Sequence, residues 1–158
     1  MSPAQQLAKL LQDKGWMLVT AESCTGGLIA AACTDLSGSS NWFERGFVTY
    51  SDQAKVELLG VDAAQIKVHG AVSEPVARAM AAGAVRRSRA QVGVSVTGIA
   101  GPTGGSAGKP VGTVWFGFAV DGVVTTELRR FGGDRAAVRA ATVQHALAGL
   151  VHRLGGAP

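Results

Sequence analysis

The sequence predicts an α/β fold: a single-domain three-layer α/β/α sandwich with a mixed sheet and a C-terminal β-hairpin. First, short apolar runs typical of buried strands alternate with segments of helical periodicity, the pattern of a sheet covered by helices. Second, Asp121-Gly122 separates two runs rich in β-branched and aromatic residues, a strong hairpin signal. Third, 158 residues with 47% hydrophobic and 16% charged side chains suffice for one core, and no repeat or linker divides them, so one domain is expected over residues 1–158.

The first half of the chain contains five predicted elements. Leucines at helical spacing predict a helix over 3–14 that ends at a glycine. A short apolar run predicts a strand over 16–21, and the alanine-rich segment after it predicts a helix over 25–35. Beyond a polar loop, a second strand is expected over 47–50, followed by a short helix over 53–59 that begins after a serine cap.

The second half begins with an irregular connection and ends with a long helix. Between them we expect a helix with a serine N-cap and a proline in its first turn, a buried strand, a long glycine-rich loop and the hairpin. In order, the ranges are 61–72 for the connection, 74–88 for the helix, 92–97 for the strand, 98–112 for the loop, 114–120 and 123–128 for the hairpin, and 133–154 for the last helix.

Charge and composition narrow the classes of partner. The formal net charge is +4, but the basic residues are scattered and lack the aromatic interleaving of a single-strand binder, so no nucleic-acid partner is expected. No apolar run is long enough to span a membrane, and the first residues do not resemble a secretory signal, so no membrane partner is expected. The two cysteines, Cys24 and Cys33, form no disulfide framework, and together these features predict a cytoplasmic protein.

The segment TAESCTGG, residues 20–27, connects the first predicted strand to the helix after it. Free backbone N–H groups and the positive end of the helix dipole converge at such a junction, and Thr25 is expected to cap the helix. Ser23 and Cys24 are both candidate nucleophiles. Because successive side chains of an extended chain point to opposite sides, only one of them should face a pocket, and the residues alone do not decide which.

A serine nucleophile needs a base, and Lys55 is the best candidate. It lies near the first turn of the helix over 53–59, where the dipole and any burial both favour the neutral amine. Tyr50, five residues earlier, could relay the proton or orient the amine. The three histidines lack the spacing of a catalytic or metal-binding set, so neither a metal nor a cofactor is expected.

A second glycine-rich segment, residues 97–110, follows the predicted strand over 92–97. A phosphate-binding loop would require a glycine in place of Thr103 and a Ser or Thr in place of Pro110, and no dinucleotide-binding G-x-G-x-x-G stands at a strand–helix junction. The remaining expectation is a strand-end loop whose backbone amides bind an anion or contact a flat ring.

Several motifs together closely resemble the CinA C-terminal domain family, and the resemblance covers almost the whole chain in order. The motifs are TAESCTGG at 20–27, GSSNWFERGFVTY at 38–50, HGAVSEP at 69–75, TGIAGP at 97–102 and KPVGTV at 109–114. The family includes stand-alone nicotinamide-nucleotide amidases. The resemblance therefore implies a hydrolase of pyridine-nucleotide recycling that converts nicotinamide mononucleotide (NMN) to nicotinate mononucleotide and ammonia.

The resemblance also implies which residues act. The family's serine, lysine and tyrosine fall on Ser23, Lys55 and Tyr50, which favours Ser23 over Cys24 as the nucleophile. The residues expected to bind the substrate are Thr25, Gly26 and Gly27 through N–H groups at the oxyanion, Gly98, Ile99, Ala100 and Gly101 at the nucleotide, and Arg45 or the pair Ser39 and Ser40 at the phosphate.

Two other functions are compatible with the sequence. A non-catalytic partner-binding module would fit the link between the family's name and competence for DNA uptake, and an amidase or esterase for another substrate would use the same residues. The partner expected under the main hypothesis is a small nucleotide substrate. In addition, a second copy of the chain could complete the long segment 37–46 and the glycine loops, which would make the protein a homodimer.

Overall fold

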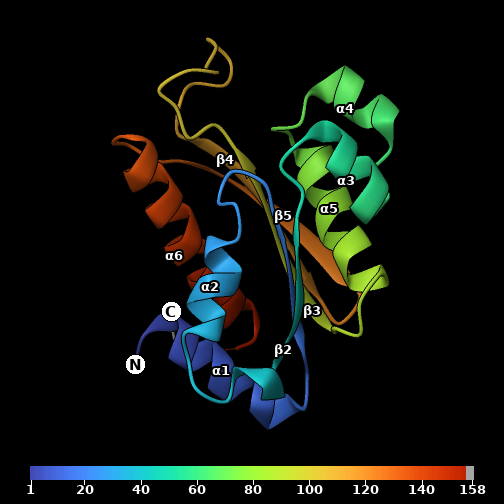
Figure 1. The fold of residues 1–158 in the computed structure, drawn as a ribbon, viewed down its shortest axis with the longest axis vertical. Helices are drawn as coiled ribbons and strands as arrows, with labels where there is room; N and C mark the ends of the chain where they lie inside the picture. Colours follow the sequence, from blue (N-terminus) through green and yellow to red (C-terminus); the bar gives the residue numbers. More distant parts are fainter. Residues whose placement is uncertain (156–158) are drawn as a thin grey trace.

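A five-stranded mixed sheet lies between two layers of helices (Figure 1). The computed structural model of the chain describes residues 1–155. The elements in chain order are α1 (Pro3–Lys14), β1 (Leu18–Glu22), α2 (Leu28–Thr34), the 3₁₀ turn η1 (Ser39–Asn41), β2 (Phe43–Val48), α3 (Asp52–Leu59), α4 (Ala63–His69), α5 (Glu74–Arg86), β3 (Val92–Gly98), β4 (Thr113–Val120), β5 (Val123–Arg130) and α6 (Arg135–Arg153). Within residues 1–155, no helix is both long and apolar enough to cross a membrane.

The strand order is β2-β1-β3-β4-β5. β1 pairs in parallel with β2 and β3, whereas β4 and β5 continue the sheet in antiparallel fashion. The predicted hairpin is confirmed, since β4 and β5 meet at Asp121 (φ 47°) and Gly122 (φ 86°), the positive φ values that a tight two-residue turn requires.

The strand order places the carboxyl ends of β1, β2 and β3 side by side. The chain leaves β1 toward one edge of the sheet through α2 and then returns past β1 to β3 through α3, α4 and α5, so the direction of travel reverses at β1. In an open α/β sheet, such a reversal separates the two connecting loops and leaves a crevice at the carboxyl ends of the strands. The loops after these three strands therefore meet at one end of the molecule.

Different helices cover the two faces of the sheet: α1, α2 and α6 lie on one side and α3, α4 and α5 on the other (Figure 1). Alternation along the strands supplies apolar side chains to both layers. Leu18 of β1 packs with Val94 and Val96 in the first core cluster, whereas Val19 and Ala21 pack in the second. The expected three-layer α/β/α sandwich is confirmed.

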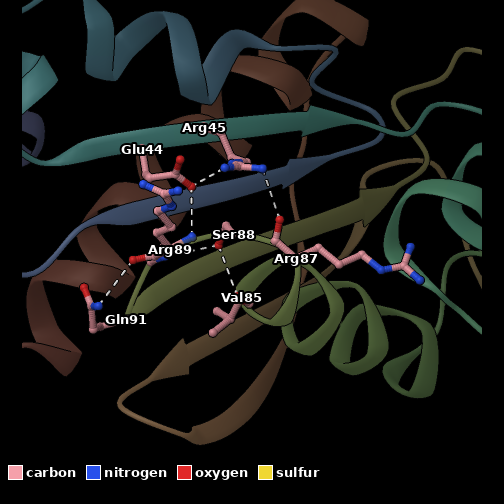
Figure 2. A network of polar contacts seen from close by, with 8 residues as sticks. Glu44, Arg45, Val85, Arg87, Ser88, Arg89 and Gln91 are labelled. Atoms are coloured by element: carbon pink, nitrogen blue, oxygen red, sulfur yellow. Dashed lines mark hydrogen bonds and ion pairs between the residues drawn. The ribbon is translucent and has the colours of Figure 1, made fainter.

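The second strand covers Phe43–Val48 instead of 47–50, because tertiary contacts satisfy polar residues that the sequence pattern assigned to a loop. The Glu44 carboxylate accepts hydrogen bonds from Arg45 Nε at 2.7 Å and from the Arg89 N–H at 3.1 Å. Arg45 also donates to the Arg87 carbonyl at 3.2 Å, so this edge strand is joined to the turn after α5 (Figure 2).

A short helix, α4, lies inside the segment 61–72 that was expected to be irregular. Asp62 caps it by accepting a hydrogen bond from the Ala64 N–H at 2.9 Å. Of its residues only Ile66 is buried, so the apolar spacing that would have predicted a helix is missing.

Gly83 on α5 offers a test of how tightly this layer is packed. A Cβ at Gly83 would lie 2.0 Å from the carbonyl oxygen of Leu59 in α3. Alanine normally stabilises a helix interior by about 1 kcal/mol relative to glycine. For Gly83→Ala we expect overpacking to outweigh this gain and to reduce the free energy of unfolding by about 1–3 kcal/mol.

Urea denaturation measures this effect, with Gly132→Ala as the matched control. No heavy atom lies within 4 Å of a Cβ at Gly132, so its stability should change by less than about 0.5 kcal/mol. A Gly83→Ala protein as stable as the wild type would contradict this expectation and show that moving α3 away from α5 costs no more than the gain in helix propensity, about 1 kcal/mol.

Candidate active site

A cavity of about 240 Å³ lies where β1, β2 and β3 end. Its walls come from the turn after β1, the start of α3, the α4–α5 connection, the end of β3 and the start of α6. The lining residues are Ser23, Cys24, Tyr50, Asp52, Lys55, Ala71, Val72, Thr97, Gly98, Ala100 and Arg135. The crevice at the reversal point of the sheet thus brings together side chains from across the sequence.

Lys55 and Ser23, 32 positions apart, meet inside this cavity. Lys55 Nζ lies 3.1 Å from Ser23 Oγ, and both residues are buried, with exposed fractions of 1% and 8%. The helix that carries the lysine, α3, is capped by Ser51, whose hydroxyl accepts a hydrogen bond from the Ala54 N–H at 3.0 Å, so the predicted serine cap is confirmed. From the first turn of α3, the long lysine side chain reaches the end of β1.

The contacts of Lys55 Nζ can be formed by a neutral amine as well as by an ammonium group, which would donate to Ser23 Oγ. Lys55 Nζ lies 2.9 Å from the carbonyl oxygen of Thr49 and 3.1 Å from that of Tyr50, with the Ser51 carbonyl more distant at 3.5 Å. A neutral amine has two N–H donors and one lone pair. If the two nearer carbonyls accept the donors, the lone pair remains for the Ser23 hydroxyl. Burial lowers the pKa of Lys55 and so favours this form.

Cys24 also lines the cavity but is in a poor state for nucleophilic attack. The expectation that only one of Ser23 and Cys24 faces the pocket is wrong, because the chain turns at these residues and is no longer extended. Burial raises the pKa of the Cys24 thiol to about 11, so it is protonated near neutral pH. Lys55 Nζ, the candidate base, contacts the Ser23 hydroxyl, so the geometry favours Ser23 over Cys24 as the nucleophile.

Tyr50 contributes to the site in two separate places. Its carbonyl oxygen accepts a hydrogen bond from Lys55 Nζ, whereas the residue as a whole is 64% exposed. The hydroxyl lies 3.5 Å from Arg135 Nη2, and across residues 1–155 it forms no hydrogen bond with Lys55 or Ser23. A direct proton relay through the tyrosine hydroxyl therefore has no contact to support it in this structure.

The turn after Ser23 differs from the expected helix start. α2 begins at Leu28 instead of residue 25, and Gly26 and Gly27 adopt positive φ values of 58° and 107°. Thr25 does not cap the helix, because its hydroxyl donates to the Glu22 carboxylate at 2.5 Å. That carboxylate caps α2 instead, a role that the sequence analysis missed because the acid stands on the strand.

The backbone N–H groups of this turn are not equivalent. The Gly26 N–H donates to the Ser23 carbonyl at 3.1 Å and is already used. In the part of the chain that the structure describes, the N–H groups of Thr25 and Gly27 have no hydrogen-bond acceptor. However, Thr25 is 0% exposed, and none of the three predicted oxyanion donors, Thr25, Gly26 and Gly27, is among the residues that line the cavity.

The structure brings only some of the predicted substrate-binding residues to the cavity. Gly98 and Ala100 line it; the Ile99 N–H instead pairs with the Thr113 carbonyl, and the Gly101 carbonyl accepts from Arg135. The three residues proposed for the phosphate, Ser39, Ser40 and Arg45, are absent from the lining: the two serines precede β2, at its other end, and the arginine joins the network of Figure 2.

Sequence reasoning also missed lining residues. Arg135 was counted among scattered basic residues, although it directly follows the cap of α6 and its Nη1 donates to the Gly101 carbonyl at 3.0 Å. Thr97 stands at the end of a strand next to β1, a position that could have indicated the site. Asp52, Ala71 and Val72 carry no such signal. Among residues 1–155 there is no group of three His, Cys, Asp or Glu side chains that could hold a metal ion.

Fold and site together define an α/β protein with a buried serine–lysine pair at the carboxyl ends of its parallel strands. The family profile of the CinA C-terminal domain matches residues 1–154. The chain therefore belongs to the CinA C-terminal domain family.

Curated relatives and solved structures agree with this membership. The chain is 60% identical to the nicotinamide-nucleotide amidohydrolase PncC of Enterobacter agglomerans over 135 residues, which are 85% of this chain and 82% of that protein. It is 51% identical to the protein of the same name from Escherichia coli K12 over 150 residues, which are 93% and 90% of the two chains. A crystal structure of a CinA superfamily protein from Klebsiella pneumoniae superposes with a TM-score of 0.93 at 41% identity, covering 96% of this chain and 95% of that one.

Proposed function

We propose that the chain is a nicotinamide-nucleotide amidase that hydrolyses the carboxamide of NMN, giving nicotinate mononucleotide and ammonia. Ser23 is the nucleophile and Lys55 the general base. The observation that carries the proposal is the distance of 3.1 Å between Lys55 Nζ and Ser23 Oγ inside a cavity. Two relatives at 60% and 51% identity are named nicotinamide-nucleotide amidohydrolases, which supports the choice of substrate.

The proposed reaction has two halves that use the same base. Neutral Lys55 takes the proton of the Ser23 hydroxyl while the oxygen attacks the amide carbon, and the new ammonium then protonates the departing nitrogen as the C–N bond breaks. Ammonia leaves, and the acyl group remains as an ester on Ser23. Water attacks this ester and gives its proton to Lys55. The proton then returns to Ser23 Oγ as the ester bond breaks.

The negative oxygen that forms in each half needs donors close to Ser23. We assign this role to backbone N–H groups of the turn that begins at Ser23, whose residue Cys24 lines the cavity. Loss of one well-placed donor of this kind costs about 10²–10³ in kcat.

Tyr50 and Arg135 are assigned to orientation and substrate binding. The Tyr50 carbonyl uses one N–H of Lys55 and so directs the amine's lone pair toward the serine. The Arg135 guanidinium, beside the Tyr50 hydroxyl, is the basic group in the lining other than Lys55, and we assign it to the phosphate of NMN.

A substrate panel tests the proposal. Ammonia release without added metal is expected from NMN, at a kcat/KM at least about tenfold above that for nicotinamide riboside, since a charge-assisted contact contributes about 1.5–3 kcal/mol. Free nicotinamide should be slower still. No release from any of the three compounds would contradict the proposal and favour the binding module, whereas equal rates for NMN and the riboside would favour an amidase for another substrate.

The homodimer and the cytoplasmic location stay predictions of the sequence. The proposed site does not require a dimer, because the serine, the lysine and the cavity belong to one copy of the chain.

A further inference from the structure

Ala71 and Val72, in the connection between α4 and α5, form an apolar wall of the cavity. The third aliphatic side chain in the lining is Ala100, which belongs to the glycine-rich loop between β3 and β4. Within residues 1–155, neither Ala71 nor Val72 takes part in a backbone–backbone hydrogen bond. The position of this wall therefore depends on side chains that hold the connection from outside.

Three consecutive carbonyl groups of the connection, those of residues 69–71, each accept a hydrogen bond from a side chain. In the order of these acceptors, the donors are Lys109 Nζ at 2.7 Å, the Ser73 hydroxyl at 2.8 Å and the Thr97 hydroxyl at 2.9 Å. Thr97 belongs to β3 and Ser73 directly precedes α5, so regular elements fix these two donors. Lys109 is different, because it comes from the glycine-rich loop.

Lys109 lies directly against the connection. A Cβ at Gly70 would be 3.1 Å from Lys109 Nζ, and Gly70 has a φ of 78°, a conformation that favours glycine. The lack of a side chain at Gly70 leaves room for the ammonium group beside the His69 carbonyl. The hydrogen bond of 2.7 Å is therefore made at close range to the backbone that leads into the wall.

The loop that carries Lys109 is itself held at two levels. At its base, the Ile99 N–H donates to the Thr113 carbonyl at 2.9 Å and the Gly112 N–H to the Ile99 carbonyl at 2.7 Å. Further out, the Ser106 N–H donates to the Lys109 carbonyl at 2.9 Å, and the Lys109 N–H to the Ser106 hydroxyl at 3.3 Å. Because the loop is held in this way, its lysine can fix the position of the segment it contacts.

We propose that Lys109 is a positioning residue that ties the glycine-rich loop to the α4–α5 connection, so that Ala71 and Val72 keep the spacing from Ala100 that the nicotinamide ring of NMN requires. A flat ring is bound by apolar walls only while these stay at contact distance. The inference rests on the proposed function, since it concerns the ring of the proposed substrate. Lys109 is not among the lining residues, so its effect on the substrate passes through the wall.

Lys109→Met tests the tie, because methionine keeps an unbranched chain and loses the donor. We expect KM for NMN to rise about tenfold, in line with the loss of one hydrogen bond from a charged donor. The value of kcat should stay within about threefold of wild type, because Lys55 and Ser23 are hydrogen-bonded to each other and not through the connection. Lys109→Arg keeps a donor and should bring KM back to within about threefold.

Lys67→Met is the matched control for the loss of charge. Lys67 lies in the last turn of α4, two residues before His69, and is not among the residues that line the cavity. Its replacement removes the same positive charge close to the same connection and should change KM by less than about twofold. A rise as large as that of Lys109→Met would show that net charge is responsible and would contradict the inference.

Nicotinamide riboside separates a positioned wall from a direct contact with the phosphate. The riboside has the ring and the ribose of NMN but lacks the phosphate. If Lys109 positions the wall, Lys109→Met should lower kcat/KM by the same factor for both compounds, within about threefold. A loss confined to NMN would show that the ammonium group acts on the phosphate and would overturn the inference.

Binding in an inactive background measures the same effect without turnover. By calorimetry, Ser23→Ala/Lys109→Met should bind NMN about tenfold more weakly than Ser23→Ala. Equal affinities in the two proteins would overturn the inference alone. Wild-type protein that releases no ammonia from NMN, or a Ser23→Ala protein that keeps its activity, would instead overturn the proposed function.

Discussion

Replacing Ser23 by alanine is expected to reduce kcat for ammonia release from NMN by about 10⁴-fold or more, the scale seen when a covalent nucleophile is removed. The reason is that Ser23 Oγ is the hydroxyl that lies 3.1 Å from Lys55 Nζ in the cavity. Ammonia release measured at saturating NMN, in parallel with the denaturation midpoint, separates loss of chemistry from loss of folding.

Cys24→Ala is the matched control, since Cys24 is adjacent, lines the same cavity and is also buried. We expect its kcat to stay within about threefold of wild type. Because burial raises the pKa of the thiol to about 11, the wild-type protein should also react slowly with iodoacetamide at pH 7.5. Activity lost in Cys24→Ala but kept in Ser23→Ala would show that the cysteine is the nucleophile.

Lys55→Met is expected to lower kcat by about 10³–10⁴-fold, because general-base catalysis and activation of the nucleophile are lost together. Methionine keeps an unbranched chain of similar length in the buried position. Lys55→Arg is the informative companion: a guanidinium can still donate to the Thr49 and Tyr50 carbonyls but stays protonated and cannot accept the serine proton. An active arginine variant would contradict the role of Lys55 as base.

The pH dependence of kcat/KM tests the same role in the unmodified protein. Protonated Lys55 cannot act as a base, so activity should be absent at low pH and rise as pH increases through the pKa of the lysine. Burial lowers that pKa, so the rise should be centred below the ordinary lysine value of about 10.4. A rise centred at or above that value would exclude a desolvated lysine as the base.

The free energy of unfolding should also depend on pH through Lys55, and the lowered pKa fixes the direction of that dependence. Because the folded-state pKa of Lys55 is the lower one, the unfolded chain binds more protons in the range between the two pKa values. The lysine therefore weakens the folded state most below its folded pKa, and the penalty disappears as pH rises through that range. The stability of wild type relative to Lys55→Met, measured by urea denaturation, should increase with pH across it.

The comparison of sequence and structure is clearest at the strand-to-helix turn. The pattern of a buried strand, TAESCTGG and an alanine-rich segment located the site correctly, because strand and helix signals are local. The cap of α2 was assigned to the wrong residue. Thr25 has the side chain of a usual cap, but the Glu22 carboxylate on the strand reaches Ile29 and Ala30, and nothing in local spacing reveals that.

The phosphate-binding residues show a second limit. Ser39, Ser40 and Arg45 are the kinds of residue that bind phosphate. However, the two serines precede β2, at the end opposite its carboxyl end, and Arg45 lies within the strand, where it is hydrogen-bonded to Glu44 and to the Arg87 carbonyl. Arg135 was passed over, because only the packing of α6 against the sheet brings its guanidinium to the cavity. The residue types indicated that a phosphate could be bound, but the positions in the fold decided which residue can reach a phosphate in the cavity.

By itself, the sequence determined the fold class, the hairpin at Asp121-Gly122 and the segment that carries the nucleophile, since each depends on the chemistry of neighbouring residues. The tertiary structure alone decided that Lys55 meets Ser23, that the Cys24 thiol stays protonated, and that Lys109 reaches the His69 carbonyl beside the cavity wall. These outcomes depend on burial and on contacts between residues as many as 40 positions apart, and the reversal of the chain at β1 brings the strand ends together.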